Sequence, residues 1–429
     1  MLITLLAVAL LAFYVAWNLG ANDVANAMGT SVGSKAVTLK QAIVIAGVLE
    51  FTGAVLFGHE VTETLATKIA NPALFAATPQ IFVIGMVTVL ISCGVWLQIA
   101  TSRSLPVSSS HAVVGAIAGF SWVALGVGAI DWPSIGLISI GWVLTPLISG
   151  AIAALFYSLI KHWILDQPNQ LVQLQEWIPW LSTALLGVFG VIVLPSLTEP
   201  LTNFVIELGF TIPAYDIPLL MGAVAAVGLT IISWRQLEDL GKTEKSTQSP
   251  IPSPQSPIPN PVERLFARFQ LLSACFVAFA HGSNDVGNAI APLAAIVYIN
   301  RTGNVPTDGI TIPIWILILG GAGIVGGLAV WGKKVIATIG ENIIALQPSS
   351  GFCAELATAT TILIASRLGL PVSTSHALVG GVVGIGLVQN IKSIKFQTLK
   401  GIAAAWLITI PVSALLSATI FSIARILFL

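Results

Sequence analysis

The sequence predicts an all-α polytopic membrane protein, built as two inverted-topology repeats that each contain a proline-turn helical hairpin. Three observations predict this fold class. The 429 residues are 56% hydrophobic and only 8% charged, whereas a soluble domain carries about 25% charged residues. Apolar runs of about 20 residues, long enough to span a bilayer core, recur along the whole chain. Short sequence blocks also recur, in the same order, in the two halves.

The apolar runs predict about 12 transmembrane segments, whose ends are uncertain by several residues. They lie near residues 2–20, 41–58, 81–100, 112–130, 136–160, 178–197, 216–234, 265–282, 312–332, 352–366, 376–391 and 401–428. The first run has no positively charged start and is long for the core of a signal peptide. We therefore expect it to remain as the first membrane helix.

One hydrophilic stretch, residues 235–264, divides the chain. Its Pro, Ser and Gln content cannot bury a core, which predicts a flexible linker. The predicted divisions are a first repeat, connecting membrane helices, the linker and a second repeat. They cover residues 1–160, 161–234, 235–264 and 265–429.

Lysine and arginine indicate the orientation, because they concentrate in cytoplasmic loops. The linker region carries Arg235, Lys242, Lys245, Arg264 and Arg268, which places the linker in the cytoplasm. Counting spans from there puts the N- and C-termini on the extracytoplasmic side of a plasma (inner) membrane. The first half then starts outside and the second half starts inside.

The two halves share four blocks. NDVANA (22–27) matches NDVGNA (284–289), and SRSLPVSSSHAVVGAIAG (102–119) matches SRLGLPVSTSHALVGGVVG (366–384). The shorter matches are 46–58 with 320–332, and 142–145 with 406–409. Because the copies start on opposite sides, they predict an inverted-topology repeat. Many secondary transporters have this architecture, with the substrate site at the repeat interface near the membrane midplane.

The Asn-Asp blocks place carboxylates inside membrane spans, which is costly unless they are paired, neutralised or bound to a cation. An Asp at position i and an Asn at i+3 share one helix face. Their oxygen atoms suit alkali or alkaline-earth cations better than soft metals. The predicted cation ligands are Asp23, Asn26, Asp285 and Asn288, which would hold sodium if sodium is the coupling ion. The alternative is that these residues cap ordinary helix ends.

Glycines accompany both Asn-Asp blocks, at Gly20, Gly29, Gly282 and Gly287. Glycine lowers helix propensity, so these positions predict a backbone that unwinds or approaches a ligand closely.

In each repeat, a proline turn is followed by a Ser/Thr run and a new apolar helix. Proline ends the preceding helix, and the exposed N–H groups of the next one form a ready site for an oxyanion. The predicted oxyanion ligands are Ser108, Ser109, Ser110, Ser373, Thr374 and Ser375. The alternative is that these hydroxyls serve only as helix caps.

The flanking Arg103 and Arg367 could attract an anion, although the favoured interpretation places them at the membrane interface. His111 and His376 are interpreted as bonded to the backbone, with proton relay as the alternative.

Two acidic residues break the repeat symmetry. Glu50 lies in an apolar run and is matched by Ile324 in the second half. We expect it to be a further cation ligand or a proton carrier; otherwise its carboxyl bonds a neighbouring helix. Glu355, which precedes the second proline turn, is a similar candidate.

Two carboxylates for cations and two helix N-termini for an anion favour cotransport, because bound cations would attract the anion. A passive channel is less favoured, since channels use symmetric rings around a continuous pore. An intramembrane Ser/His enzyme is disfavoured because Ser110 and His111 are adjacent, a poor geometry for a base and its nucleophile. A net charge of zero without a basic patch argues against nucleic-acid binding.

The doubled Asn-Asp-Val-x-Asn-Ala motif and the paired PVS(S/T)SH turns resemble the PiT family of inorganic phosphate transporters. The resemblance covers nearly the whole chain apart from the linker. It implies a twelve-span, cation-coupled phosphate symporter without a cofactor, commonly a homodimer, whose coupling ion is sodium or a proton. It also implies that Asn22, Asp23, Asn284 and Asp285 bind phosphate together with the Ser/Thr turns. Sulfate or another oxyanion remains the alternative substrate.

Overall fold

The computed structural model describes residues 2–103, 105–207, 213, 215–246, 260–307, 309–339 and 343–428. Within these ranges the regular structure is helical, apart from an isolated bridge between Ala70 and Ile130. The prediction of an all-α protein is therefore confirmed for the part of the chain that the structure describes.

The helices follow one another along the chain as the apolar runs predict. The α-helices are α1 Leu2–Gly33, α2 Leu39–Phe57, α3 His59–Thr67, α4 Pro79–Ser102, α5 Ser109–Leu125, α6 Trp132–Ile160, α7 Gln170–Ile192, α8 Leu194–Glu207, α9 Asp216–Ser246, α10 Pro261–Thr302, α11 Ile314–Ile339, α12 Pro348–Arg367, α13 Thr374–Gln389 and α14 Phe396–Phe428. The short turns are η1 Pro72–Phe75, η2 Val127–Ala129, η3 Lys161–Leu165 and η4 Ile391–Ser393.

Eight helices of the described chain are long and apolar enough to cross a membrane. The number is nine if α7 and α8, which meet at a 62° bend, form one span. The helices α5 and α13 are apolar but shorter, with 17 and 16 residues. The chain is thus a multi-pass membrane protein, whereas the prediction of about 12 spans is not confirmed.

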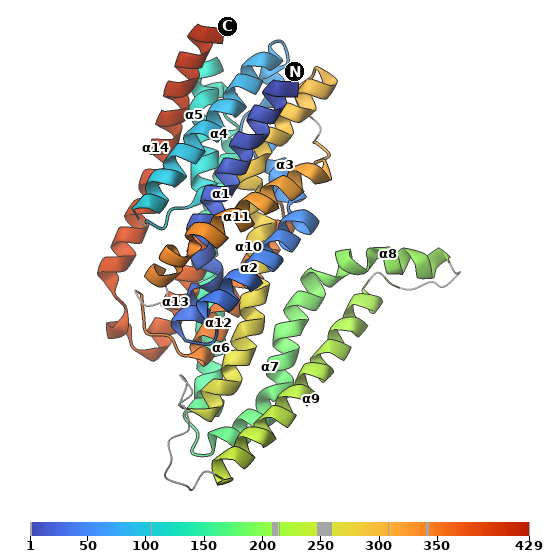
Figure 1. Cartoon of the computed structure of the whole chain (residues 1–429), viewed down its shortest axis with the longest axis vertical. Helices are drawn as coiled ribbons and strands as arrows, with labels where there is room; N and C mark the ends of the chain where they lie inside the picture. Colours follow the sequence, from blue (N-terminus) through green and yellow to red (C-terminus); the bar gives the residue numbers. More distant parts are fainter. Residues whose placement is uncertain are drawn as a thin grey trace.

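The short helices belong to two hairpins. Figure 1 places α4 and α5 in the half of the bundle that contains both termini, and α12 and α13 in the opposite half. Each hairpin turns at its proline motif, which lies between α4 and α5 or between α12 and α13. The two hairpins therefore occupy opposite ends of the molecule.

The helices α1 and α10 run without a break through the Asn-Asp blocks, over 32 and 42 residues. The predicted spans 2–20 and 265–282 were therefore too short, and the predicted unwinding at the glycines is wrong. Gly20 and Gly282 instead permit close helix packing. A Cβ atom at Gly20 would clash with the Ile324 carbonyl oxygen of α11, and one at Gly282 with the Glu50 carbonyl oxygen of α2.

Close glycine contacts come in matching pairs across the two halves. Gly115 on α5 lies against Ile410 of α14, and Gly380 on α13 lies against Pro146 of α6. The main helix contacts follow the same pattern: α1 packs on α11, α10 on α2, α5 on α14 and α13 on α6. Each of these pairs joins one half of the sequence to the other, so the halves are intertwined.

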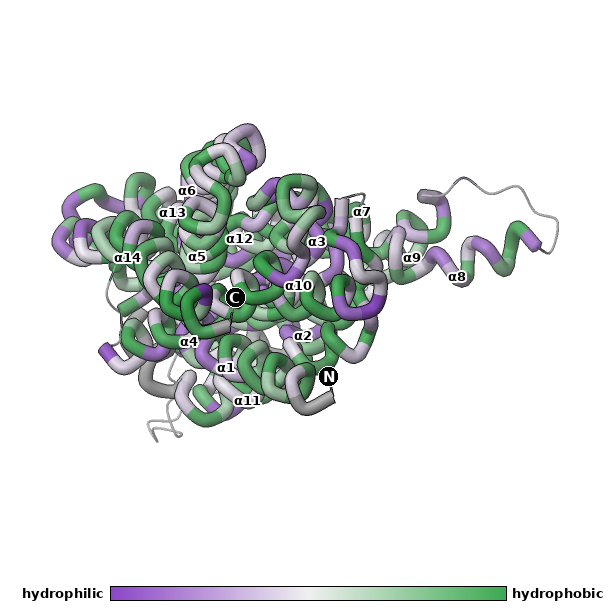
Figure 2. The backbone as a smooth tube through the Cα atoms, turned by 90° about the horizontal axis from the view of Figure 1, so that it is seen from above, coloured by the Kyte–Doolittle hydropathy of each residue, from purple (hydrophilic) through white to green (hydrophobic). Residues whose placement is uncertain are grey.

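Three helices stand apart from the bundle. Figures 1 and 2 show α7, α8 and α9 projecting to one side, where α7 and α9 pack mainly against each other. Trp234 Nε1 on α9 donates a hydrogen bond to the Gln175 carbonyl of α7 at 2.8 Å. The helix α9 continues to Ser246, so residues 235–246 of the predicted linker are helical. Linker residues 247–259 lie outside the described residues.

Apolar side chains face outward and polar ones gather inside. Large hydrophobic residues such as Trp122, Val143 and Leu407 are more than half exposed on the bundle surface, and Figure 2 shows hydrophobic residues along its outer helices. Such a surface suits lipid tails, which leave no water to solvate polar groups. The buried polar residues in the centre therefore call for a chemical explanation.

Candidate functional site

The two Asn-Asp blocks meet in the centre of the bundle. Asp23 lies on α1 and Asp285 on α10, and their side chains are only 2% and 1% exposed. Both residues are well inside their helices, which run to Gly33 and Thr302. The alternative that the blocks cap helix ends is therefore wrong, and two buried carboxylates remain to be stabilised.

Within each block, Asp and Asn share one face of the helix, as their spacing predicts. Asn26 Nδ2 donates to Asp23 Oδ1 at 3.1 Å, and Asn288 Nδ2 lies 3.5 Å from Asp285 Oδ1. These contacts orient each carboxylate along its own helix.

The proline turns place α5 and α13 with their N-termini beside this pair. Ser108 and Ser373 are the N-cap residues, and their hydroxyls accept hydrogen bonds from the His111 and His376 N–H groups, both at 3.3 Å. The hydroxyls of these two serines therefore act as helix caps, the role considered as the alternative to oxyanion binding. It leaves the following hydroxyl in each turn free for other partners.

The second hydroxyl of each turn contacts the carboxylate of its own half. Ser109 Oγ donates to Asp23 Oδ2 at 3.0 Å. Thr374 Oγ1 donates to Asp285 Oδ2 at 2.9 Å. The proline turns therefore reach the depth of the buried carboxylates.

The same two hydroxyls also bond the opposite half. Asn288 Nδ2 donates to Ser109 Oγ at 3.1 Å, and Asn26 Nδ2 donates to Thr374 Oγ1 at 3.4 Å. Each hydroxyl thus links a carboxylate of one copy to an amide of the other. The two carboxylates and the two hairpin turns thus belong to one hydrogen-bond network.

The first asparagine of each block holds its hairpin through the backbone. Asn22 Nδ2 donates to the Leu105 carbonyl and Asn284 Nδ2 to the Leu370 carbonyl, both at 3.1 Å. The side-chain amide oxygens of Asn22 and Asn284 are not engaged in these bonds. Among the described residues, Asn22 Oδ1, Asn284 Oδ1 and Asn288 Oδ1 are buried without a hydrogen-bond partner. Unpartnered buried oxygens are rare in proteins and mark a place for a cation or a donor.

His281 is a central residue of the cluster that the sequence reasoning missed. Its Nδ1 lies 3.2 Å from Glu50 Oε1, and its Nε2 lies 3.0 Å from Asp285 Oδ2. Neither contact meets hydrogen-bond geometry. Each ring nitrogen nevertheless faces a carboxylate oxygen, so the imidazole lies between two acidic side chains.

Glu50 and His281, which contact each other, both stand at positions where the other half of the sequence has an apolar residue. His281 directly precedes Gly282, whereas Leu19 precedes Gly20 in the first half. Glu50 is in turn matched by Ile324. The contact of Glu50 with His281, between α2 and α10, thus stands where the matching positions on α11 and α1 carry the apolar residues Ile324 and Leu19. This double asymmetry, with histidine four residues before Asp285, was a signal available in the sequence.

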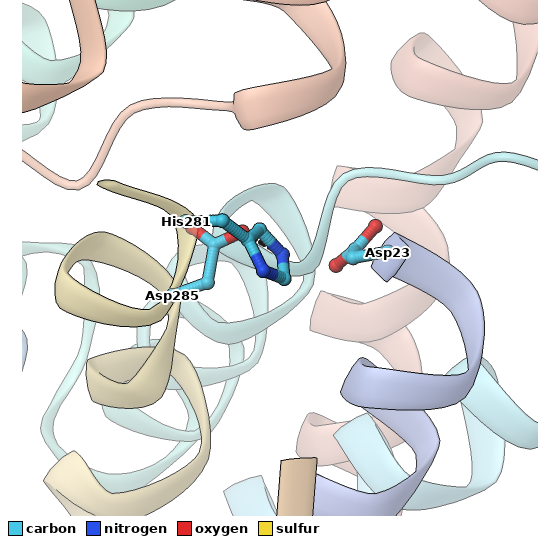
Figure 3. Close-up of side chains that lie close together, drawn as sticks. All are labelled: Asp23, His281 and Asp285. Carbon is cyan, nitrogen blue, oxygen red and sulfur yellow. Dashed lines mark ion pairs between the residues drawn. The ribbon is translucent and has the colours of Figure 1, made fainter. Parts of the chain in front are cut away.

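The central groups together could hold a cation. Ligand atoms of Asp23, His281 and Asp285 lie within 4.8 Å of one another, and Figure 3 shows the Asp23 carboxylate facing the imidazole from the other helix. Three carboxyl groups, those of Asp23, Asp285 and Glu50, accompany a single imidazole, so the cluster would carry a net negative charge when fully ionised. A cation bound among ionised carboxylates would be strongly attracted in a medium of low dielectric constant.

Glu355 is buried in a separate polar cluster. Its carboxylate accepts hydrogen bonds from Thr30 (2.7 Å), Ser31 (2.6 Å), Gln270 (3.0 Å) and Ser273 (2.7 Å). These donors come from α1 and α10, while Glu355 is on α12. Its partners among the described residues are therefore neutral donors, and the carboxylate joins the second hairpin to both motif helices.

The charged and aromatic residues near the turns have other partners. Arg367 donates through Nε and Nη2 to the Ile192 carbonyl, each at 3.0 Å, at the end of α7. His111 Nδ1 and His376 Nδ1 lie 3.2 and 3.0 Å from the carbonyl oxygens of Trp406 and Trp142. The histidines thus bond the backbone, as their favoured interpretation predicts.

Comparison with known proteins gives one consistent result. The profile of the phosphate transporter family matches residues 19–417 of the chain. The chloroplastic inorganic phosphate transporter 2-1 of Arabidopsis thaliana is 40% identical over 422 residues, which cover 95% of this chain and 70% of that protein.

A solved structure shares the fold as well as the sequence pattern. It is described as "The sodium-dependent phosphate transporter", with 34% identity and a TM-score of 0.85. The match covers 99% of this chain and 99% of the other chain. The similarity in fold therefore extends over both halves of the chain.

Proposed function

Because the chain belongs to the phosphate transporter family, we propose that it takes up inorganic phosphate by symport with a cation. The chain is a membrane transporter rather than an enzyme, as are the proteins to which it is similar. One observation carries the proposal: the buried carboxylates of Asp23 and Asp285 accept hydrogen bonds from hydroxyls of the two hairpin turns, and these hydroxyls also bond asparagines of the other half.

The proposed cation ligands are the oxygens of Asp23, Asn26, Asp285 and Asn288. Two facts support them: the carboxylates are buried, and the Asn288 amide oxygen has no partner among the described residues. Oxygen donors suit sodium, which makes sodium the first choice of coupling ion and the proton the second. The similar solved structure is described as sodium-dependent.

Glu50 and Glu355 belong to the proposed cation-binding set in different ways. Glu50 acts on the cluster through His281, which it contacts. Glu355 could bind a cation only after some of its hydroxyl donors turn away, because they occupy both of its oxygens.

Phosphate binding follows from the same contacts. The proposed phosphate ligands are Asn22, Asp23, Ser108, Ser109, Ser110, Asn284, Asp285, Ser373, Thr374 and Ser375. The Ser109 and Thr374 hydroxyls donate to the carboxylates. A cation on a carboxylate would weaken that bond and release the hydroxyl for an oxyanion at the helix N-terminus. Cation binding would thus promote phosphate binding, and phosphate would promote cation binding equally.

Phosphate is favoured over sulfate by hydrogen-bond chemistry. Phosphate near neutral pH still carries protons and can donate to a carboxylate, whereas sulfate cannot. The unpartnered oxygens Asn22 Oδ1 and Asn284 Oδ1 offer further acceptors beside the turns. Sulfate therefore remains the second candidate substrate.

Alternating access completes the proposed mechanism. The two hairpins occupy opposite ends of the bundle, and matching contacts join the halves, as expected for inverted repeats. We propose that the repeats exchange which side is open while the central cluster holds both ions. The proposed assembly is a homodimer in the plasma (inner) membrane, with both termini outside and the linker inside.

Labelled phosphate uptake into proteoliposomes tests the function. We expect saturable uptake that an inward sodium gradient stimulates and sulfate does not inhibit. If only a proton gradient stimulates phosphate uptake, the coupling ion is the proton rather than sodium. Uptake of sulfate but not phosphate would overturn the substrate, and non-saturable flux without any cation gradient would indicate a channel.

A further inference from the structure

Two tryptophans occupy matching positions beside the hairpins. Trp142 on α6 and Trp406 on α14 belong to the matched blocks WVLT and WLIT. The carbonyl of each one lies next to the histidine Nδ1 of the opposite half, His376 and His111 respectively, at 3.0 and 3.2 Å. Each indole ring packs on the histidine of its own half, with centroid distances of 4.0 and 3.7 Å. The two tryptophans are therefore held in the same way.

The indole N–H groups of these residues differ. Trp142 Nε1 donates a hydrogen bond to the Pro371 carbonyl, in the second proline turn, at 3.0 Å. The matching bond would run from Trp406 Nε1 to the Pro106 carbonyl in the first turn. Trp406 Nε1 is instead buried without a partner among the described residues. The difference concerns one bond within an otherwise symmetric arrangement.

A second contact shows the same asymmetry. Ser110 Oγ, from the first turn, donates to the Val372 carbonyl of the second turn at 2.8 Å. In the matching place, Ser375 Oγ lies 2.9 Å from Ser373 Oγ, and no bond to the Val107 carbonyl is found in the described part of the chain. In both contacts a backbone carbonyl of the second proline turn is the acceptor, and the matching carbonyls of the first turn, those of Pro106 and Val107, accept no such bond among the described residues.

A buried donor without a partner calls for an explanation, because nearly all such groups are bonded. Alternating access between inverted repeats exchanges the conformations of the two halves. A bond present in one half is then expected in the other half when the transporter faces the other way.

We propose that Trp142 and Trp406 are reciprocal latches for the two proline turns. In the state described here, Trp142 Nε1 holds the second turn through the Pro371 carbonyl. In the opposite state, Trp406 Nε1 takes the Pro106 carbonyl and holds the first turn. The proposal rests on the proposed function, because it assumes that the repeats exchange states. It makes both residues positioning residues, since neither touches the carboxylate cluster.

The latches are tested by thiol labelling of the full-length protein in proteoliposomes without phosphate. Cys93, Cys275 and Cys353 are first replaced by alanine, and a single cysteine is introduced as Leu105→Cys or Leu370→Cys. These residues lie in the two turns, and their side chains do not make the bonds to Asn22 and Asn284, which use the backbone carbonyls. The labelling rate of each cysteine then reports how often its turn is released.

The two tryptophan variants should act in opposite directions. Trp142→Phe should speed labelling of Leu370→Cys and slow labelling of Leu105→Cys, while Trp406→Phe should do the reverse. One neutral hydrogen bond predicts a change of about two- to tenfold in each rate. Ser110→Ala should resemble Trp142→Phe, which provides a second variant that leaves both indoles in place.

Trp132→Phe is the matched control, because its Nε1 also donates to a backbone carbonyl, at Val127 (3.1 Å), away from both turns. It should change neither rate. Shifts in the same direction for both tryptophan variants, or no effect of Trp406→Phe, would overturn the latch proposal even if phosphate uptake is normal. Opposite shifts without any phosphate uptake would keep the latches and overturn the proposed substrate.

Discussion

The central chemistry depends on a few side chains whose charges do not balance. Asp23, Asp285 and Glu50 are buried with one imidazole, His281, among them. A buried charge is tolerated only with a partner, so an ion that comes and goes can control the arrangement. An ion bound to a carboxylate would change the hydrogen bond from the Ser109 or Thr374 hydroxyl, and therefore the contact that holds the hairpin turn.

Neutralising one aspartate should abolish coupled uptake. In Asp23→Asn or Asp285→Asn, the cluster loses a charged cation ligand, while the amide retains the size of the side chain. Phosphate uptake under a sodium gradient should fall by about tenfold or more, with normal elution of the purified protein in size-exclusion chromatography. Glu176→Gln, which removes an exposed carboxylate on α7, should transport normally. Normal uptake in both aspartate variants would contradict the assignment of the cluster.

Variants of Glu50 and His281 can distinguish an effect on stability from an effect on transport. Glu50→Ile or His281→Leu alone leaves a buried charge with one partner fewer, which should lower the thermal unfolding midpoint. Losing one partner of a buried pair costs about 3 kcal/mol or more. The double variant recreates the apolar residues of the matching positions, Leu19 and Ile324, and should regain most of the lost stability but not the uptake. Equal destabilisation by the double variant, measured in detergent, would show that the two residues do not act as a pair.

At the scale of helices, glycine packing and the hairpin turns determine where the cluster lies. Gly20 and Gly282 bring α1 against α11 and α10 against α2. Because these contacts involve backbone atoms, they leave little tolerance for a side chain. The carboxylates three residues further on are placed by this approach of the helices.

Gly282→Ala should therefore destabilise the protein. Its Cβ would collide with the Glu50 carbonyl oxygen, so α2 would have to move and the pair with His281 would be disturbed. Alanine at Gly228 on α9 would meet nothing within 4 Å and should be neutral or slightly stabilising, since alanine favours helix. The thermal unfolding midpoints of the two variants measure the difference. A loss at Gly282 no larger than at Gly228 would argue against close packing there.

The sequence predicted most of the elements and much of the cluster, for identifiable reasons. Repeated motifs and i, i+3 spacing brought Asp23 and Asp285 into one site, and the serine caps were predicted from local chemistry. The continuity of α1 and α10 was missed, because glycine can equally serve unwinding or close packing. His281 was missed because its partner Glu50 is distant in sequence, on a helix whose packing only the structure shows.

At the scale of the whole molecule, the fold intertwines its two halves around one buried cluster. Each of the helices α1, α10, α5 and α13 packs on a helix of the other half, and the turn hydroxyls bond both halves. The two hairpins are therefore connected through side chains of both halves. Such an arrangement is suited to couple two ions within a single transport cycle.

The most direct test of this coupling is the movement of sodium driven by phosphate. Proteoliposomes with equal sodium on both sides receive an inward phosphate gradient, and the entry of radioactive sodium is followed, with Asp285→Asn as the control. The account predicts that sodium accumulates only when the phosphate gradient is present and only in the unaltered protein. No phosphate-dependent sodium entry in the unaltered protein, while labelled phosphate still enters, would contradict it.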